Sequence, residues 1–413
     1  MLHRRSALLA ASGLAMLAAA GIAAPARAAD QVVKIGIDAS LTGGDAQSAL
    51  LVKNGAIMAV DEANAKHLVP GVKFEAMVLD DGTATAGQYD PAQGAINARK
   101  MVADRAVMAA VGPQMSGVGK AMAPILSWGD LATITPSSTN PDLTDPKFAQ
   151  QYRPAGKPIY FRTVATDNYQ GPNMANFFAD TLKVKSVYVL DDTGAYGEGL
   201  ANAFQGQAEK KGIKVLGHDK LDPKAADYSA VLAKIKQLNP DSLYYGGVMQ
   251  AGVKLVKQAY DILPHTMPKA GGDGLITPEL LTGAGSPANE GWYCTNASPH
   301  VTEDPAAQAW VQAYKAKFNV LPDDYAITAY DGTVVIIDAV KRVKDSGKKI
   351  TRDAVRDAIQ TAKVKTLQGV VSFDENGDIK DRVISIFQVQ HYPKYPADDM
   401  IHQFKYVGVA PQS

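Results

Sequence analysis

A regular alternation of short β-branched runs with longer helix-like stretches, from residue 32 to residue 271, most constrains what this chain can fold into. The strand-like runs are 32–37, 72–79, 107–111, 132–135, 160–163, 186–190, 213–216, 242–245 and 268–271, and the helix-like stretches are 47–64, 92–103, 118–128, 173–182, 199–211, 227–238 and 251–261. Strands that alternate with helices form βαβ units, whose parallel sheets are covered by helices on both faces. The sequence therefore predicts an α/β protein with Rossmann-like parallel sheets.

The alternation falls into two series, separated by a segment rich in proline and glycine near 150–160. Such a composition interrupts regular structure. After residue 300 the pattern predicts helices over 305–318, 325–344 and 351–361 and strands over 369–373 and 383–389. The length of 413 residues suits two domains or one large domain. Two similar lobes would account for the two series, although their sequences do not visibly repeat.

Residues 1–28 have the composition of an export signal. His3-Arg4-Arg5 supplies a basic start, an apolar run extends from Ala7 to Ala24, and Ala26-Arg27-Ala28 forms a small-x-small cleavage site. We therefore predict a signal peptide over 1–28, cleavage near Ala28 and a periplasmic product. The arginine pair leaves plain secretory export and twin-arginine export both open.

Charge and motif content argue against several classes of protein. The 42 basic residues equal the 42 acidic residues, which gives no electrostatic reason to expect nucleic acid or an anionic membrane as a partner. Cys294 is the single cysteine, so no intrachain disulfide is expected. Phosphate-loop, nucleophile-elbow, zinc-protease and dithiol motifs do not occur, and the seven histidines are scattered. We expect no catalytic step, no cofactor and no metal.

Polar residues gather in the loops that follow the predicted strands. They are Ser116, Ser137, Ser138, Thr139, Tyr196 and Asp273, and the apolar candidates Met115 and Val248 lie in the same loops. In open parallel sheets, ligands bind outside the carboxyl ends of the strands, where the loops converge. Hydroxyls and helix N-terminal amides suit a carboxylate, and a buried aspartate among glycines requires a cationic partner such as an ammonium group.

Each of these residues also has a plain structural alternative. Ser116 fits a helix N-cap, and Ser137 to Thr139 fit a turn. Asp273 fits an exposed turn aspartate, and Tyr196 fits a loop aromatic. Their occurrence at corresponding strand ends in both series favours a shared ligand site.

Five segments carry a resemblance to a known family. They are 134–139 (ITPSST), 196–200 (YGEGL), 227–229 (DYS), 244–247 (YYGG) and the closing segment 369–378, which ends in FDENGD. In order and spacing they resemble the leucine/isoleucine/valine-binding proteins of ABC importers. The resemblance implies a type I periplasmic binding protein, in which two lobes joined by three crossovers close over a ligand like a flytrap. It places lobe 1 at 29–162 plus 298–385 and lobe 2 at 163–297 plus 386–413.

The same resemblance implies roles for individual side chains. It puts Ser116, Ser137 and Thr139 on the carboxylate and amino groups of an amino acid, with Tyr196 covering the ligand from the second lobe. Asp273 falls where the family often has a glutamate on the α-ammonium group, and Tyr325 lines the side-chain pocket.

Two departures bear on specificity. Ser48 and Val248 stand where branched-chain binders can carry tyrosine. A more open pocket would admit an aromatic or otherwise larger side chain.

The sequence predicts a monomeric binding protein that captures an amino-acid-like ligand and delivers it to an ABC permease in the inner membrane. Three alternatives stay open. The ligand could lack an α-amino group, as an aromatic acid or amide does. The protein could be a periplasmic hydrolase that uses Asp191, Asp192 or Ser137, or a sensor domain for a signalling partner.

Overall fold

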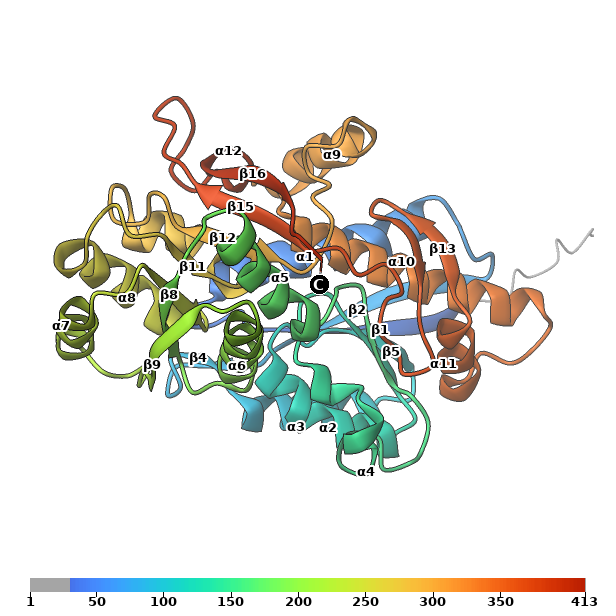
Figure 1. Cartoon of the computed structure of the whole chain (residues 1–413). Coiled ribbons are helices and arrows are strands. Elements are labelled where there is room, and N and C mark those ends of the chain that lie inside the picture. The colour runs from blue at the N-terminus through green and yellow to red at the C-terminus, as the bar shows by residue number, and fades with distance from the viewer. Residues whose placement is uncertain (1–29, 413) are drawn as a thin grey trace, which may run out of the picture.

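A computed structural model describes residues 30–412, and the predicted signal peptide over 1–28 lies outside the described residues. The chain forms two lobes, each built on its own sheet with helices packed against it (Figure 1). The first lobe contains a five-stranded parallel sheet in the order β2-β1-β5-β6-β7. Its strands are β1 (Gln31–Ala39), β2 (Val72–Asp80), β5 (Val107–Val111), β6 (Ala132–Thr135) and β7 (Tyr160–Arg162).

The second lobe contains a seven-stranded sheet in the order β16-β15-β12-β11-β10-β8-β9. Its strands are β8 (Ser186–Asp191), β9 (Lys214–Lys220), β10 (Ser242–Gly246), β11 (Lys269–Gly271), β12 (Tyr293–Asn296), β15 (Ser385–Val389) and β16 (Phe404–Val409). The first five in chain order pair in parallel, whereas β15 and β16 run antiparallel at one edge. The predicted α/β class with parallel sheets is thereby confirmed.

Helices cover the five-stranded sheet on both sides. Figure 1 shows α2, α3 and α4 on the opposite side of β1 and β2 from α1 and α10. The helices of this lobe are α1 (Ala46–Ala65), α2 (Pro91–Ala103), α3 (Ser116–Trp128), α4 (Ala149–Tyr152), α10 (Asp324–Asp345) and α11 (Arg352–Gln360), with the short turns η1 (Pro141–Leu143) and η2 (Pro146–Phe148). Two small hairpins, β3 (Gly82–Thr83) with β4 (Gln88–Tyr89) and β13 (Lys363–Thr366) with β14 (Gly369–Ser372), complete it.

The seven-stranded sheet has its own helices. They are α5 (Asp167–Asp180), α6 (Ala195–Lys210), α7 (Ser229–Leu238), α8 (Met249–Ile262) and α12 (Met400–Gln403), with the turns η3 (Asp273–Leu275) and η4 (Leu280–Ala284). In this lobe α5 packs on α6, and α8 packs on α7 and η4. The turn η5 (Pro305–Ala307) and α9 (Gln308–Phe318) follow β12, and α9 packs against α1.

The described chain crosses between the two sheets three times. It enters the second lobe after β7, returns to the first lobe between β12 and α10, and enters the second lobe again between β14 and β15. The lobe boundaries at 162/163, 297/298 and 385/386 remain a proposal. The last of them lies beside Ser385, the first residue of β15.

The crossing of α1 over α10 fixes two elements that reach the space between the lobes. Gly55 of α1 lies so close to α10 that a Cβ there would overlap the Ala326 carbonyl oxygen. A glycine is required because any side chain would push the two helices apart. This contact holds Ser48 and Tyr325, at the N-terminal ends of the two helices, in a fixed relationship.

Several predicted boundaries differ from the structure. The helix predicted over 305–318 is a 3₁₀ turn followed by α9, because Pro305 starts the turn and Asp304 accepts a hydrogen bond from the Ala306 N–H at 2.8 Å. The helix predicted over 227–238 begins at Ser229, and the strand predicted over 213–216 continues to Lys220. The strands β3, β4, β12, β13 and β16 do not correspond to any predicted strand. Among residues 30–412, no helix combines the length and apolar character needed to cross a bilayer.

Candidate ligand-binding cleft

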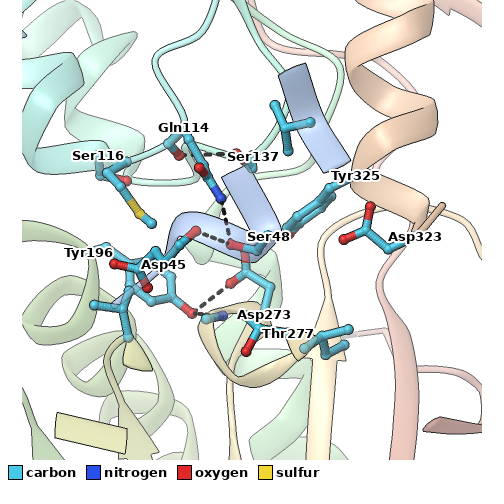
Figure 2. Close-up of a pocket in the computed structure, with 15 residues that line it drawn as sticks. Asp45, Ser48, Gln114, Ser116, Ser137, Tyr196, Asp273, Thr277, Asp323 and Tyr325 are labelled. Carbon is cyan, nitrogen blue, oxygen red and sulfur yellow. Dashed lines mark hydrogen bonds between the residues drawn. The ribbon is translucent and has the colours of Figure 1, made fainter. Parts of the chain in front are cut away.

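A cavity lies between the lobes, and interfaces between domains are where small-molecule sites commonly occur (Figure 2). The first lobe contributes Asp45, Ser48, Val52, Gln114, Met115, Ser116 and Ser137, the second contributes Tyr196, Val248, Asp273, Gly274, Ile276 and Thr277, and the N-terminal end of α10 contributes Asp323 and Tyr325. The loops that follow β1, β5, β6, β8, β10 and β11 therefore meet at one place, as expected for the carboxyl ends of parallel strands.

Asp273 is a buried carboxylate held by two tyrosines from different parts of the fold. Tyr196 of α6 donates to Oδ1 at 2.6 Å, and Tyr325 of α10 donates to Oδ2. The Asp273 N–H donates to Oε1 of Gln170 at 3.0 Å, which fixes the backbone of the turn. Burial raises the pKa of Asp273, and the two phenol donors act in the opposite direction. An anion held in this way is suited to a cationic ligand group.

Ser116 and Ser137 lie across the cavity from Asp273 in Figure 2. The Ser137 hydroxyl donates to the Gln114 carbonyl at 3.0 Å, and the Ser116 hydroxyl accepts from the Asn140 N–H at 3.2 Å. Ser116 is the first residue of α3, and Met115 at the N-cap forms no side-chain cap. Because the dipole of a helix favours negative charge at its N-terminus, this side of the cavity suits an anion.

Two predicted residues do not line this cavity. The Ser138 hydroxyl donates to the Ser116 hydroxyl at 3.3 Å, and the Thr139 carbonyl accepts from the Asp167 N–H at 3.0 Å. Gln170 joins this region to the cavity, because its Nε2 donates to Asp167 at 3.0 Å while its Oε1 accepts from Asp273. Ser138 and Thr139 therefore support the cavity wall from behind.

The other eight predicted residues all line the cavity: Ser48, Met115, Ser116, Ser137, Tyr196, Val248, Asp273 and Tyr325. Whether each of them binds a ligand stays a prediction.

Sequence reasoning missed four polar lining residues, which are Asp45, Gln114, Thr277 and Asp323. Burial raises the pKa of Asp45 and of Asp323 to about 7. Gln114 donates to the Ser48 hydroxyl at 3.1 Å. Asp45 follows the end of β1, a loop to which the strand-end rule was not applied, whereas Gln114 lies in the same loop as the predicted Met115 and Ser116.

Hydrogen bonds outside the cavity lining also join the two lobes. The Asn140 side chain donates to the Ala195 carbonyl at 2.8 Å, and the Gln250 side chain donates to the Ala86 carbonyl at 3.0 Å. Each bond joins an element of the first lobe to an element of the second. The described structure therefore holds the lobes in a closed arrangement.

Two lobes that close over a cavity with opposite charge preferences on its two sides define a solute-binding protein. Residues 32–394 match the sequence family described as periplasmic binding protein. The chain is 33% identical over 357 residues to the Leu/Ile/Val-binding protein BraC3 of Rhizobium johnstonii, which covers 86% of this chain and 91% of the relative. It is 30% identical over 375 residues to the leucine-, isoleucine-, valine-, threonine- and alanine-binding protein of Pseudomonas aeruginosa, over 91% of this chain and 94% of the relative.

Among solved structures, a leucine binding protein LivK from Thermotoga maritima superposes with a TM-score of 0.77 at 26% identity, covering 92% of this chain and 98% of that one. The chain belongs to the branched-chain amino-acid type of the periplasmic binding protein family. It is a substrate-binding protein and not an enzyme.

Proposed function

We propose that this protein binds a free α-amino acid in the interlobe cleft and delivers it to an ABC permease in the inner membrane, acting as a monomer in the periplasm. The observation that carries the proposal is the Asp273 carboxylate, held by Tyr196 and Tyr325 on one side of a closed cavity. The N-terminus of α3 and the hydroxyls of Ser116 and Ser137 stand on the other side. Such a cavity is complementary to both charges of a zwitterion.

The ligand's ammonium group would pair with Asp273. A buried carboxylate is costly without a cation, and the two tyrosine hydroxyls leave its remaining lone pairs for the ligand. The ligand's carboxylate would take the amides at the start of α3 together with the hydroxyls of Ser116 and Ser137. Relatives named for binding leucine, isoleucine, valine, threonine and alanine support the amino-acid class.

Closure would couple binding to delivery. A ligand shifts an open–closed equilibrium only through its differential affinity for the closed state. The proposed ligand meets that requirement because it contacts Ser116 in the first lobe and Asp273 in the second lobe at once. The permease would then recognise the closed form.

The segment 1–28 supports a periplasmic location. Its basic start, apolar run and Ala26-Arg27-Ala28 form the pattern of a cleaved export signal. Mass spectrometry of the protein from the periplasmic fraction tests this assignment, and a mature N-terminus at Ala29 is expected.

Isothermal titration calorimetry with amino acids and with their deaminated carboxylic acids tests the proposed ligand class. The wild-type protein should bind at least one α-amino acid. Its affinity for the corresponding acid without the amine should be about a hundredfold or more lower. Asp273→Asn should abolish amino-acid binding, whereas Asp345→Asn, on the exposed end of α10, should not change it. Unchanged affinity in Asp273→Asn, or tight binding of an aromatic acid alone, would refute the proposal.

A further inference from the structure

The cavity contains more carboxyl groups than the ammonium group of an amino acid needs. Besides Asp273, its lining includes Asp45 and Asp323, and none of the described lining residues is a lysine, arginine or histidine. One ammonium group compensates one carboxylate. The remaining two carboxylates have no cationic partner within the lining.

Asp45 is not explained by a structural role in its own helix. It occupies the N-cap position of α1, yet its side chain makes no cap hydrogen bond. The residue is 1% exposed, and its Oδ2 atom is buried without a hydrogen-bond partner. Buried carboxylate oxygens in folded proteins are paired in the great majority of cases, so an unpaired one in a cavity wall indicates a missing donor.

Gln114 provides a second acceptor of the same kind. Its Nε2 donates a hydrogen bond to the Ser48 hydroxyl, and that hydroxyl in turn donates to the Asp45 carbonyl at 2.9 Å. Its Oε1 is buried and has no partner. The bond to Ser48 orients the amide, and the buried oxygen is the acceptor that it leaves for a ligand. Asp45, Ser48 and Gln114 thus form one connected group with two unsatisfied acceptors (Figure 2).

Neighbouring charges do not satisfy this group. The charges that raise the pKa of Asp45 most are those of Glu279 and then Asp192, and both are negative. The Met249 N–H gives partial compensation. One carboxylate oxygen of Asp323 accepts a hydrogen bond from the Ala326 N–H at 2.7 Å and caps α10. Its other carboxylate oxygen is left for a ligand.

We propose that the ligand is an amino acid with a cationic side chain, whose amine or guanidine group pairs with Asp45 and donates to Gln114. This inference rests on the proposed function, because it assigns Asp273 to the α-ammonium group. A branched aliphatic side chain offers no donor and would leave both acceptors buried and unpaired. Sites built to form hydrogen bonds discriminate strongly against analogues that lack the bonding group.

Calorimetry with lysine, ornithine, arginine, glutamine, leucine and norleucine tests the inference on the full-length mature protein. Lysine and norleucine form the sharpest pair, since norleucine has no side-chain ammonium group. At least one of the three cationic amino acids should bind about tenfold or more tighter than norleucine and leucine. Equal or tighter binding of norleucine, leucine or glutamine would overturn the proposal.

Variants separate a ligand contact from a structural role. Asp45→Asn should remove most of the preference for the cationic amino acid over norleucine. Gln114→Leu, which keeps the size of the side chain, should reduce the same preference. It takes the place of Asp45→Asn as the test if that variant does not fold. Asp104→Asn, on the outer surface of the first lobe, is the matched control and should change neither affinity.

The outcomes distinguish this inference from the proposed function. Tight binding of leucine with weak binding of lysine would leave the proposed amino-acid function intact and refute the cationic side chain. Failure of every amino acid to bind would refute the proposed function itself. Unaltered discrimination in both Asp45→Asn and Gln114→Leu would refute the assigned contacts.

Discussion

The Glu279 carboxylate in the second lobe accepts a hydrogen bond from the Gln47 backbone N–H in the first lobe at a distance of 2.7 Å. The same oxygen accepts from the Ser48 N–H at 3.3 Å. Both amides belong to the first turn of α1, where the helix dipole favours an anion. Glu279 therefore joins the two lobes in the closed arrangement through a charge at the end of a helix.

Replacing this charge should loosen the closed state. Glu279→Gln keeps an acceptor oxygen but removes the charge, which is worth about 1 kcal/mol at a helix N-terminus. Since ligand affinity scales with the population of the closed state, we expect affinity to fall about fivefold. Calorimetry measures the affinity, and small-angle scattering of the ligand-free protein should report a larger radius. Glu198→Gln, on the surface of α6, is the control; equal affinity in both variants would contradict the role of Glu279.

The two tyrosines on Asp273 should set the pH range of binding. Each phenol donor holds the pKa of Asp273 down, so Tyr325→Phe should let that pKa rise. Loss of a hydrogen bond to a charged group costs about 1.5–3 kcal/mol, which corresponds to a loss of about tenfold or more in amino-acid affinity. The loss should grow as the pH is lowered. Tyr330→Phe on the same helix should leave the affinity and its pH profile unchanged, because Tyr330 bonds to Glu62 away from the cleft.

Much of the fold followed from the sequence because the βα units are local. The runs at 107–111 and 132–135 are apolar or β-branched throughout, and both are buried strands in the structure. The sequence did not predict the strands β12 and β16. β12 is four residues long, and β16 is an edge strand that pairs with β15. A four-residue strand is too short to show a period, and Gly408 interrupts the strand pattern of β16.

The site shows the same limit at the level of single side chains. The strand-end rule correctly placed Ser137 and Asp273 in the lining of the same cavity, because the rule depends only on topology. It also selected Thr139, whose neighbours in the structure are Asp167 and the region behind the wall. Which residue of a loop faces a cavity depends on the conformation of the turn, and the sequence alone does not determine it.

Buried carboxyl groups should make the ligand-free protein more stable at mildly acidic pH. Burial raises the pKa of Asp45, Asp167 and Asp323 to about 7. The largest charge effects on them come from Glu279, Asp273 and Asp324 respectively, all of which are acidic.

The folded chain therefore binds more protons than the unfolded chain from about pH 4 to about pH 7. The stability that these groups contribute is fully present below the pKa of an ordinary aspartate and is lost as the pH rises through about 7. We expect the Tm, measured by calorimetry without ligand, to decrease from pH 5.5 to pH 8. Asp167→Asn should flatten that slope; a Tm that increases over this range would contradict the assignment.

The crossing of α1 and α10 allows stability and binding to be tested together. Gly55→Ala would place a Cβ against the Ala326 carbonyl oxygen, and backbone has little room to yield at a helix crossing. Overpacking of this kind costs about 1–3 kcal/mol, so the Tm should fall by several degrees. Ligand affinity should fall as well, because α1 and α10 carry Ser48 and Tyr325 into the cleft. Gly206→Ala in α6 is the control: a Cβ there meets open space, and the helix should gain up to about 1 kcal/mol. If Gly55→Ala were as stable as Gly206→Ala, the close approach of the two helices would not constrain the cleft.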